Sequence, residues 1–172
     1  MSNAFNKLFQ KFESYIARKN NFPYILHSKI KILYIDIYTY KGKEILLKDG
    51  SIIKKGDTIG ELHIDNIKIK NIDNKFDIVS SLLLDELQNI KNALINGEYD
   101  GLKAVYGVTL LHPIAKRFGF TIVNINMSPK KIFLILWDNI LRVAFRKNKL
   151  KSSNKFREPK QCWLSRGQIL KM

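Results

Sequence analysis

The segment from Gly60 to Asn66 constrains the fold most, because polar and apolar side chains alternate along it. As a β-strand, it places its two aliphatic side chains on one face and its polar side chains on the other, namely Glu61, His63 and Asp65. Two carboxylates flanking an imidazole are costly to bury unless each group has a hydrogen-bond partner. The segment therefore predicts either a solvated strand face or the floor of a polar site.

Length and composition indicate one well-cored domain. The chain has 172 residues, 45% of them hydrophobic, which is enough for one core and short for two. Cys162 is the single cysteine, so the sequence excludes an internal disulfide framework and a cysteine-based zinc cluster. No secretory signal is visible at residues 1–5, and the longest apolar run, Ile132–Trp137, is too short to span a bilayer. We expect a cytoplasmic protein that is at most peripheral at the inner face of the membrane.

The net charge of +15 is unevenly distributed. Residues 1–126 carry 18 basic and 13 acidic side chains, a net of +5, whereas residues 127–172 carry 12 basic and 2 acidic, a net of +10. Codon bias explains why Lys outnumbers Arg 24 to 6, but it acts evenly along a chain. The asymmetry favours an anionic partner such as a membrane surface, and a solvated basic face is the alternative. Nucleic acid is the least favoured partner, because no binding module is recognisable. The candidate anion contacts are Arg142, Arg146, Lys147, Lys149 and Lys151.

Periodicity predicts an α+β fold in a single domain spanning residues 1–172, with a small antiparallel β-meander packed against amphipathic helices. An amphipathic helix is expected within residues 1–21. The meander occupies residues 29–69, and Asp49-Gly50 predicts a type I′ hairpin turn within it. Its expected strands are 29–40, 44–47, 51–53 and 58–64.

Helices and strands alternate in the second half of the chain. Asp77 or Ser80 is the expected cap of a helix with core residues Leu83, Leu84, Leu87, Ile90 and Leu94, which Gly97 ends. Residues 102–108 fit strand and helix equally well. The remaining expected elements are a helix at 110–118, a strand at 120–125, a helix from Ser128-Pro129 to about 145, a basic loop at 146–160, a strand at 161–164 and a final turn capped by Ser165.

Metal and nucleophile motifs find little support. His63 and His112 could bind zinc or iron with a nearby carboxylate, but neither His-x-x-x-His nor His-x-His spacing occurs. Ser165 could join His63 and Asp65 in a triad, but no Gly-x-Ser-x-Gly elbow surrounds it. We expect no metal and no cofactor.

Three blocks of sequence resemble the YkoP-like family of Gram-positive bacteria. They are GDTIGELHIDN at residues 56–66, YGVTLLH running on to FGF at residues 106–120, and the segment around WLSR at residues 159–170. The family occurs as stand-alone proteins and as a domain attached to polysaccharide deacetylases, with glycosyltransferases as companions. The resemblance implies a cell-envelope or polysaccharide setting, with polysaccharide-modifying enzymes as partners. The metal-binding motifs of a deacetylase are absent, so that activity is not implied.

We therefore expect an accessory, non-catalytic domain that binds an anionic or sugar-bearing ligand of the cell envelope. A lipid-linked sugar is one such ligand. Imidazole and amide groups would bind hydroxyls, Trp163 would stack on a sugar ring, and Arg166 with Lys116 or Arg117 would meet phosphate. The candidate ligand site consists of His63, Asp65, Asn66, His112, Lys116, Arg117, Trp163, Ser165 and Arg166. The alternative is an enzyme of the same pathway with a histidine as general base and Asp65 orienting it.

Two geometric expectations follow. If the polar blocks form one site, the side chains of His63 and His112 lie within about 10 Å of each other, because ligand pockets gather a few polar groups. Alternation along 161–164 predicts that Trp163 faces outward. In the alternative arrangement Trp163 fills the core, and Arg166 pairs with a carboxylate such as Glu61 or Asp65.

Overall fold

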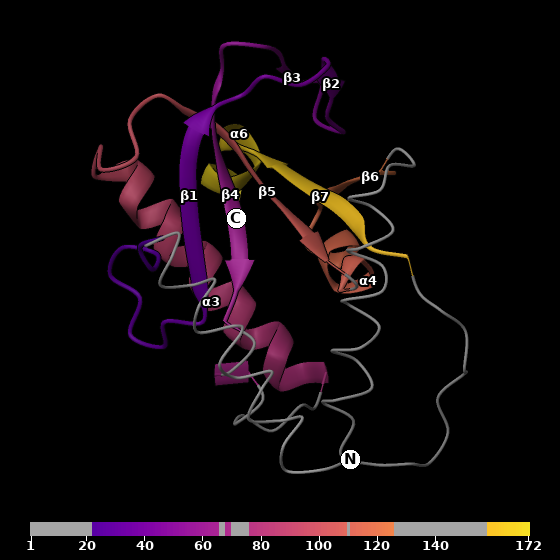
Figure 1. Ribbon diagram of the computed structural model, residues 1–172. Helices are drawn as coiled ribbons and strands as arrows, with labels where there is room; N and C mark the ends of the chain where they lie inside the picture. Colours follow the sequence, from indigo (N-terminus) through magenta and orange to yellow (C-terminus); the bar gives the residue numbers. More distant parts are fainter. Residues whose placement is uncertain (1–21, 66–67, 70–75, 110, 126–157) are drawn as a thin grey trace, which may run out of the picture.

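A five-stranded mixed sheet organises the computed structural model, which describes residues 22–65, 68–69, 76–109, 111–125 and 158–172 (Figure 1). The strand order is β1-β4-β5-β7-β6. Strands β4 and β5 run parallel, and the other three neighbouring pairs are antiparallel. The strands are β1 (Leu33–Thr39), β4 (Thr58–Ile64), β5 (Leu102–Thr109), β6 (Thr121–Val123) and β7 (Lys160–Ser165).

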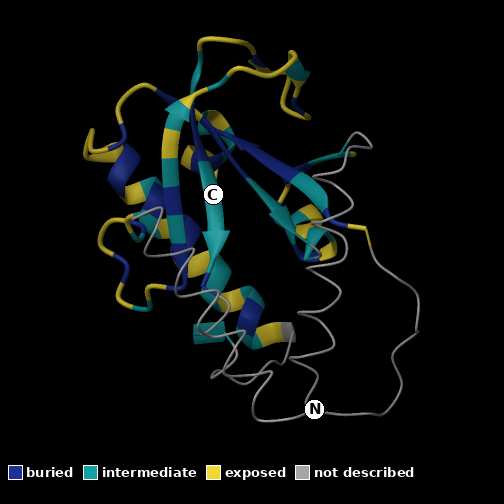
Figure 2. Ribbon diagram, viewed as in Figure 1, coloured by how far each residue is buried: buried dark blue, intermediate teal, exposed yellow. Residues whose placement is uncertain are grey.

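Helices cover one face of this sheet. The long helix α3 (Phe76–Ile95) and the short helix α6 (Arg166–Lys171) pack their apolar side chains on it, and α4 (His112–Arg117) follows β5. Figure 2 shows the resulting alternation of buried and exposed positions along α3. None of the described helices is long and apolar enough to cross a membrane. The predicted α+β class is confirmed, and residues 102–108 form a strand.

The core stripe of α3 differs from the prediction at one position. Leu87, Ile90 and Leu94 are buried in the main cluster as expected, whereas Leu84 is exposed. Leu83, Leu87, Ile90 and Leu94 follow the i, i+4, i+7 and i+11 spacing of one helix face, and Leu84 lies one residue, about 100° around the helix axis, from Leu83. The expected helix end at Gly97 is confirmed, because Gly97 follows the last turn with a φ of 77°.

The expected meander is interrupted by a separate hairpin. Strands β2 (Ile45–Leu46) and β3 (Ile52–Ile53) form their own two-stranded sheet, so β1 pairs directly with β4. The predicted type I′ turn is wrong. Leu47 N–H donates to Ser51 O at 2.8 Å, and within this turn Gly50 alone has a positive φ, of 85°. A type I′ turn needs two such residues, so the geometry fits a three-residue loop that ends in a left-handed glycine.

Several predicted elements lie outside the described residues. They are the helix within 1–21, the helix that begins at Ser128-Pro129, and the basic loop apart from residues 158–160.

A buried carboxylate ties the segment that precedes β1 to α3. Glu86 is 0% exposed, and its Oε1 accepts hydrogen bonds from Ser28 Oγ at 2.8 Å and from the Ile32 amide at 2.9 Å. Buried polar groups are costly unless paired, so both donors depend on this carboxylate.

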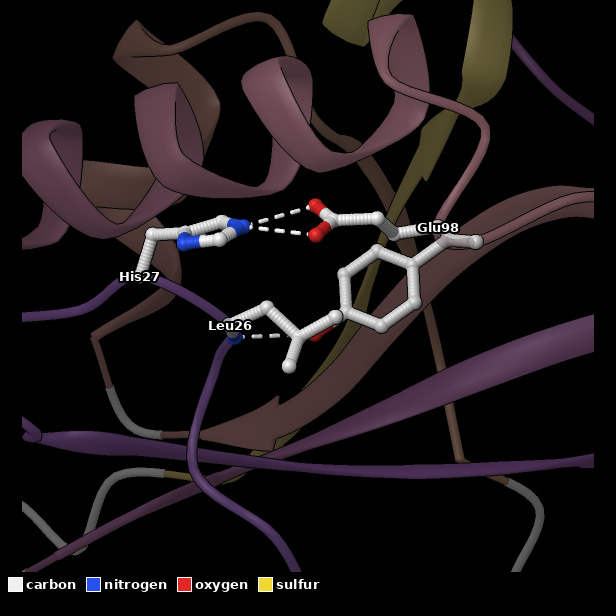
Figure 3. Close-up of polar contacts among 4 residues, drawn as sticks. Leu26, His27 and Glu98 are labelled. Carbon is white, nitrogen blue, oxygen red and sulfur yellow. Dashed lines mark hydrogen bonds and ion pairs between the residues drawn. The ribbon is translucent and has the colours of Figure 1, made fainter.

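The tip of the same segment is held by the loop after α3. Figure 3 shows His27 facing Glu98, and the His27 Nε2 lies 2.7 and 2.8 Å from the two carboxylate oxygens. The Leu26 amide donates to the Tyr99 hydroxyl at 3.0 Å. These contacts hold His27 in a left-handed conformation, with a φ of 62°.

Replacing the buried carboxylate tests this anchor. We expect Glu86→Ala to lower the free energy of unfolding by about 3 kcal/mol, because two buried donors lose their acceptor. Asp85→Ala, at the neighbouring exposed position of α3, is the matched control and should change it by less than about 0.5 kcal/mol. Urea denaturation measures both, and equal effects would show that Glu86 is not an anchor.

Candidate functional site

The face of the sheet opposite α3 and α6, which we call the polar face, carries tyrosine, carboxylate and imidazole side chains. The predicted shared face of Glu61 and His63 is confirmed, because their cross-strand partners are Asp36 and Tyr34, two alternate residues of β1. One row of this face crosses all five strands. It consists of Asp36, Glu61, Tyr106, Trp163 and Thr121.

Asp65 lies just beyond β4 and is the centre of the first polar cluster. Its Oδ2 accepts hydrogen bonds from the hydroxyls of Tyr24 at 2.9 Å and Tyr34 at 3.0 Å, and the two hydroxyls are 2.8 Å apart. Its Oδ1 accepts from the Lys68 amide at 3.0 Å, while its carbonyl accepts from the Ile69 amide. Asp65 therefore also binds the backbone at residues 68 and 69, which gives this buried carboxylate a structural role.

Burial keeps the Tyr34 phenol of this cluster protonated. Desolvation, and then the hydrogen bond with Tyr24 and the charge of Asp65, raise the pKa of Tyr34 far above its usual value. The Tyr34 phenol therefore serves as a hydrogen-bond donor rather than as a base.

The second cluster surrounds Glu61. The hydroxyls of Tyr38 and Tyr106 lie 2.7 Å apart, and the Tyr38 hydroxyl donates to Glu61 Oε2 at 3.4 Å. Burial raises the pKa of both phenols. The Tyr106 ring stacks on Trp163 with centroids 4.3 Å apart, so this cluster rests directly on the core.

His63 lies between the two clusters and is bonded to neither within the described structure. Its ring stacks on Phe22 with centroids 4.9 Å apart, and its buried Nε2 has no hydrogen-bond partner among the described residues. The oxygens of Asp65 are occupied by tyrosine hydroxyls and the Lys68 amide. The histidine–aspartate pair that the enzyme alternative needs is therefore not formed in this structure.

His112 lies at the same end of the sheet as His63. It begins α4, three residues after β5 ends. Because β4 and β5 are parallel, the carboxyl ends of both strands lie at the same end of the sheet. Their separation of less than about 10 Å stays a prediction. Lys116 and Arg117 are exposed in the last turn of α4.

The expected outward position of Trp163 is wrong. The side chain is 1% exposed and packs in a second core cluster with Leu47, Ile53 and Ile59, and its Nε1 donates to Gln161 Oε1 at 3.2 Å. Alternation along β7 does hold, but the β2–β3 hairpin covers the face that Trp163 occupies. Stacking of this indole on a sugar is therefore not available in this structure.

Ser165 and Arg166 are also committed to the fold. The buried Ser165 hydroxyl donates to Asp49 Oδ2 and accepts from the Gln168 amide at 3.0 Å, which completes the predicted cap of α6 as a capping box. The Arg166 guanidinium donates to the carbonyl oxygens of Tyr99 at 3.3 Å and Leu102 at 3.4 Å. The alternative pairing of Arg166 with Glu61 or Asp65 is therefore wrong.

The structure does not bring candidate residues of all three sequence blocks into one cleft, because Arg166 lies far from His63 and His112. Ser165 pairs with Ala104 near the start of β5, whereas α4 begins beyond Thr109 at its other end. At a rise of roughly 3.3 Å per residue, these ends of β5 lie about 17 Å apart. Arg166 therefore lies at the opposite end of the sheet from His63 and from the cations of α4.

Other candidates lie outside the described residues, namely Asn66, Arg142, Arg146, Lys147, Lys149 and Lys151. Within the part of the chain that is described, no group of three or more His, Cys, Asp or Glu side chains is placed to hold a metal ion.

The tyrosines of the polar face were missed by sequence reasoning. Their signal is the alternation of Tyr34, Asp36 and Tyr38 along β1, which Tyr40 continues just after the strand, with isoleucines at the intervening positions 35 and 37. A polar stripe beside the Glu61 strand would have predicted hydroxyl–carboxylate pairs between neighbouring strands.

Comparison with known proteins agrees with the three sequence blocks. The family described as the YkoP domain matches residues 2–172. The chain belongs to this family. It is also similar to the "Uncharacterized protein YkoP" of Bacillus subtilis (strain 168), with 29% identity over 99 residues that make up 49% of this chain and 51% of the relative. The chain thus matches about half the length of this curated relative. No solved structure matches the chain.

Truncation of the buried indole gives a direct test of its role. We expect Trp163→Ala to lower the free energy of unfolding by roughly 3–5 kcal/mol, as large core truncations do. Trp163→Phe keeps a ring against Tyr106 and should cost less. Chemical denaturation measures both, and a Trp163→Ala midpoint close to that of the parent protein would contradict the buried position.

The contact between Asp49 and Ser165 predicts a pH dependence. Burial alone would raise the pKa of Asp49, but hydrogen bonds from Ser165 and Ser51 outweigh it and lower the pKa below its usual value. A lowered folded-state pKa stabilises the fold above the unfolded value of about 3.9, and that stability is lost as the pH falls through the folded-state pKa.

We expect Asp49→Ala to be less stable than the parent protein at neutral pH, with a difference that shrinks below about pH 4. Urea denaturation across this range measures the difference. A gap that stayed constant or widened on acidification would contradict the assignment.

Proposed function

We propose that this YkoP-domain protein is a non-catalytic accessory domain that binds a sugar-bearing ligand on the polar face, at the end that carries His63. The observation that supports this most is the row of hydroxyl–carboxylate pairs on β1, β4 and β5, with an unpartnered imidazole nitrogen between them. Sugars are bound through hydroxyl groups by carboxylates, imidazoles and phenols, and their apolar faces stack on aromatic rings.

Charge narrows the class of ligand. Asp36, Glu61 and Asp65 lie at this face, and the ammonium group described against it is that of Lys68, which lies 4.4 Å from the centre of the Tyr24 ring. A phosphate beside three carboxylates would be repelled. The ligand we propose is therefore a neutral or amine-bearing sugar, and an anionic group would have to be bound elsewhere on the chain.

Binding is favoured over catalysis by the state of the titratable groups. A general base needs a pKa near the working pH and an orienting partner. The phenols of Tyr34 and Tyr106 have raised pKa values, and His63 lacks the carboxylate that would orient it. A histidine-based enzyme of the same pathway remains the alternative.

The biological setting rests on the family. The YkoP-like resemblance implies polysaccharide-modifying enzymes of the cell envelope as partners, and we propose that the domain acts beside such enzymes at the cytoplasmic face.

Titration with soluble N-acetylglucosamine oligosaccharides and their de-N-acetylated counterparts tests the ligand class, with calorimetry and NMR chemical shifts as readouts. We expect Tyr34→Phe and His63→Ala to weaken binding by about fivefold each, since one hydrogen bond contributes about 1 kcal/mol. Tyr40→Phe is the matched control, because Tyr40 bonds to the Lys43 carbonyl at the other end of β1.

The proposal would be contradicted if the protein bound neither sugar series, or if Tyr40→Phe weakened binding as much as Tyr34→Phe does. Appearance of a chemically altered sugar during the incubation would favour the enzyme alternative instead.

A further inference from the structure

The β2–β3 hairpin exposes an apolar pair that the core does not use. Leu46 and Ile52 are cross-strand partners, so their side chains lie on the same face of the hairpin, and they are 68% and 49% exposed. Large aliphatic side chains scattered singly on a surface are ordinary, whereas two adjacent ones at the tip of a projecting element form a patch. Figure 1 shows the hairpin extending past the end of the main sheet.

The side chains on the inward face of the hairpin make the contacts that hold it on the main sheet. Leu47 and Ile53 are buried against Trp163, and the Lys48 amide donates to Thr121 Oγ1 at 2.9 Å. Asp49 is bonded to Ser165. These contacts anchor the hairpin to the main sheet, and its outward pair can be replaced without loss of them.

Unpaired lysines surround the apolar pair. The segment 41–55 carries five lysines against two acidic residues, Glu44 and Asp49, which gives it a net charge of +3. All five ammonium groups belong to exposed residues, and none forms an ion pair with a described residue. The lysines are Lys41, Lys43, Lys48, Lys54 and Lys55.

We propose that this hairpin docks the protein on an anionic lipid surface. An element that combines apolar side chains with flanking lysines inserts the former at the headgroup boundary and pairs the latter with lipid phosphates. A second copy of the chain is a poorer occupant, because two such hairpins would bring two clusters of five lysines together.

The docking site lies away from the proposed sugar site. The hairpin joins the end of β1 to the start of β4, whereas His63 lies at the far end of β4. Docking would therefore leave the His63 end of the polar face directed away from the lipid. The two proposals are independent, and either can fail alone.

Co-sedimentation with vesicles tests the proposal, using phosphatidylcholine alone or mixed with phosphatidylglycerol. We expect the protein to bind the mixed vesicles at low salt and to be released as salt is added. Leu46→Ser with Ile52→Ser should weaken binding by about tenfold or more without any change in net charge. Ile95→Ser is the matched control, because Ile95 is 63% exposed at the end of α3.

A second pair of variants separates the hairpin from the general basicity of the chain. We expect Lys43→Gln with Lys54→Gln to weaken binding more than Lys116→Gln with Lys171→Gln, which removes the same charge elsewhere. Replacing Leu46 by Trp should give a blue-shifted emission on vesicle addition, and Ile95→Trp should not.

Three results would overturn the proposal. They are absence of binding to the mixed vesicles, equal binding by the Leu46→Ser, Ile52→Ser variant whose thermal unfolding matches the parent protein, or a dimer in analytical ultracentrifugation that this variant dissociates.

Discussion

Parallel pairing of β4 with β5 is the constraint on which the rest of this structure depends. Two adjacent parallel strands cannot be joined by a tight turn, so the chain between them must cross over the sheet. Helix α3 lies within that crossover, and its apolar stripe covers one face of the sheet. The pairing thereby determines which face of the sheet remains for polar side chains. It also places His63 and His112 at the same end of the sheet.

Both faces of β7 are buried as a consequence of how the elements are layered. Cys162 and Leu164 pack in the cluster formed with α3 and α6, while Trp163 packs under the β2–β3 hairpin. Burial raises the pKa of the Cys162 thiol to about 12, which makes this thiol a core group rather than a nucleophile. A strand with two covered faces shows no polar alternation, which is why its pattern alone does not tell which face is outer.

Local signals in the sequence predicted local structure well. The Thr58–Ile64 strand, the helix that ends before Gly97 and the Ser165 cap all follow from alternation, periodicity and capping chemistry, which act between near neighbours. The errors at Trp163 and Arg166 concern residues whose contacts come mostly from segments more than 50 residues away, whereas the turn at Asp49-Gly50 and the exposed Leu84 are errors of local pattern. The environment of Trp163 and Arg166 depends on tertiary packing, which no pattern within β7 encodes.

The candidate site also combines features that follow from local sequence with features that depend on distant segments. The shared face of Glu61 and His63 follows from strand periodicity, but the partners of Asp65 do not, because Tyr24 and Tyr34 reach it from 41 and 31 residues away. Those phenols change the chemistry that the motif suggests: they occupy the carboxylate that would otherwise orient an imidazole. A polar motif that is already saturated by its own fold keeps few free groups for a substrate, and the buried Nε2 of His63 is the atom of this motif that has no hydrogen-bond partner among the described residues.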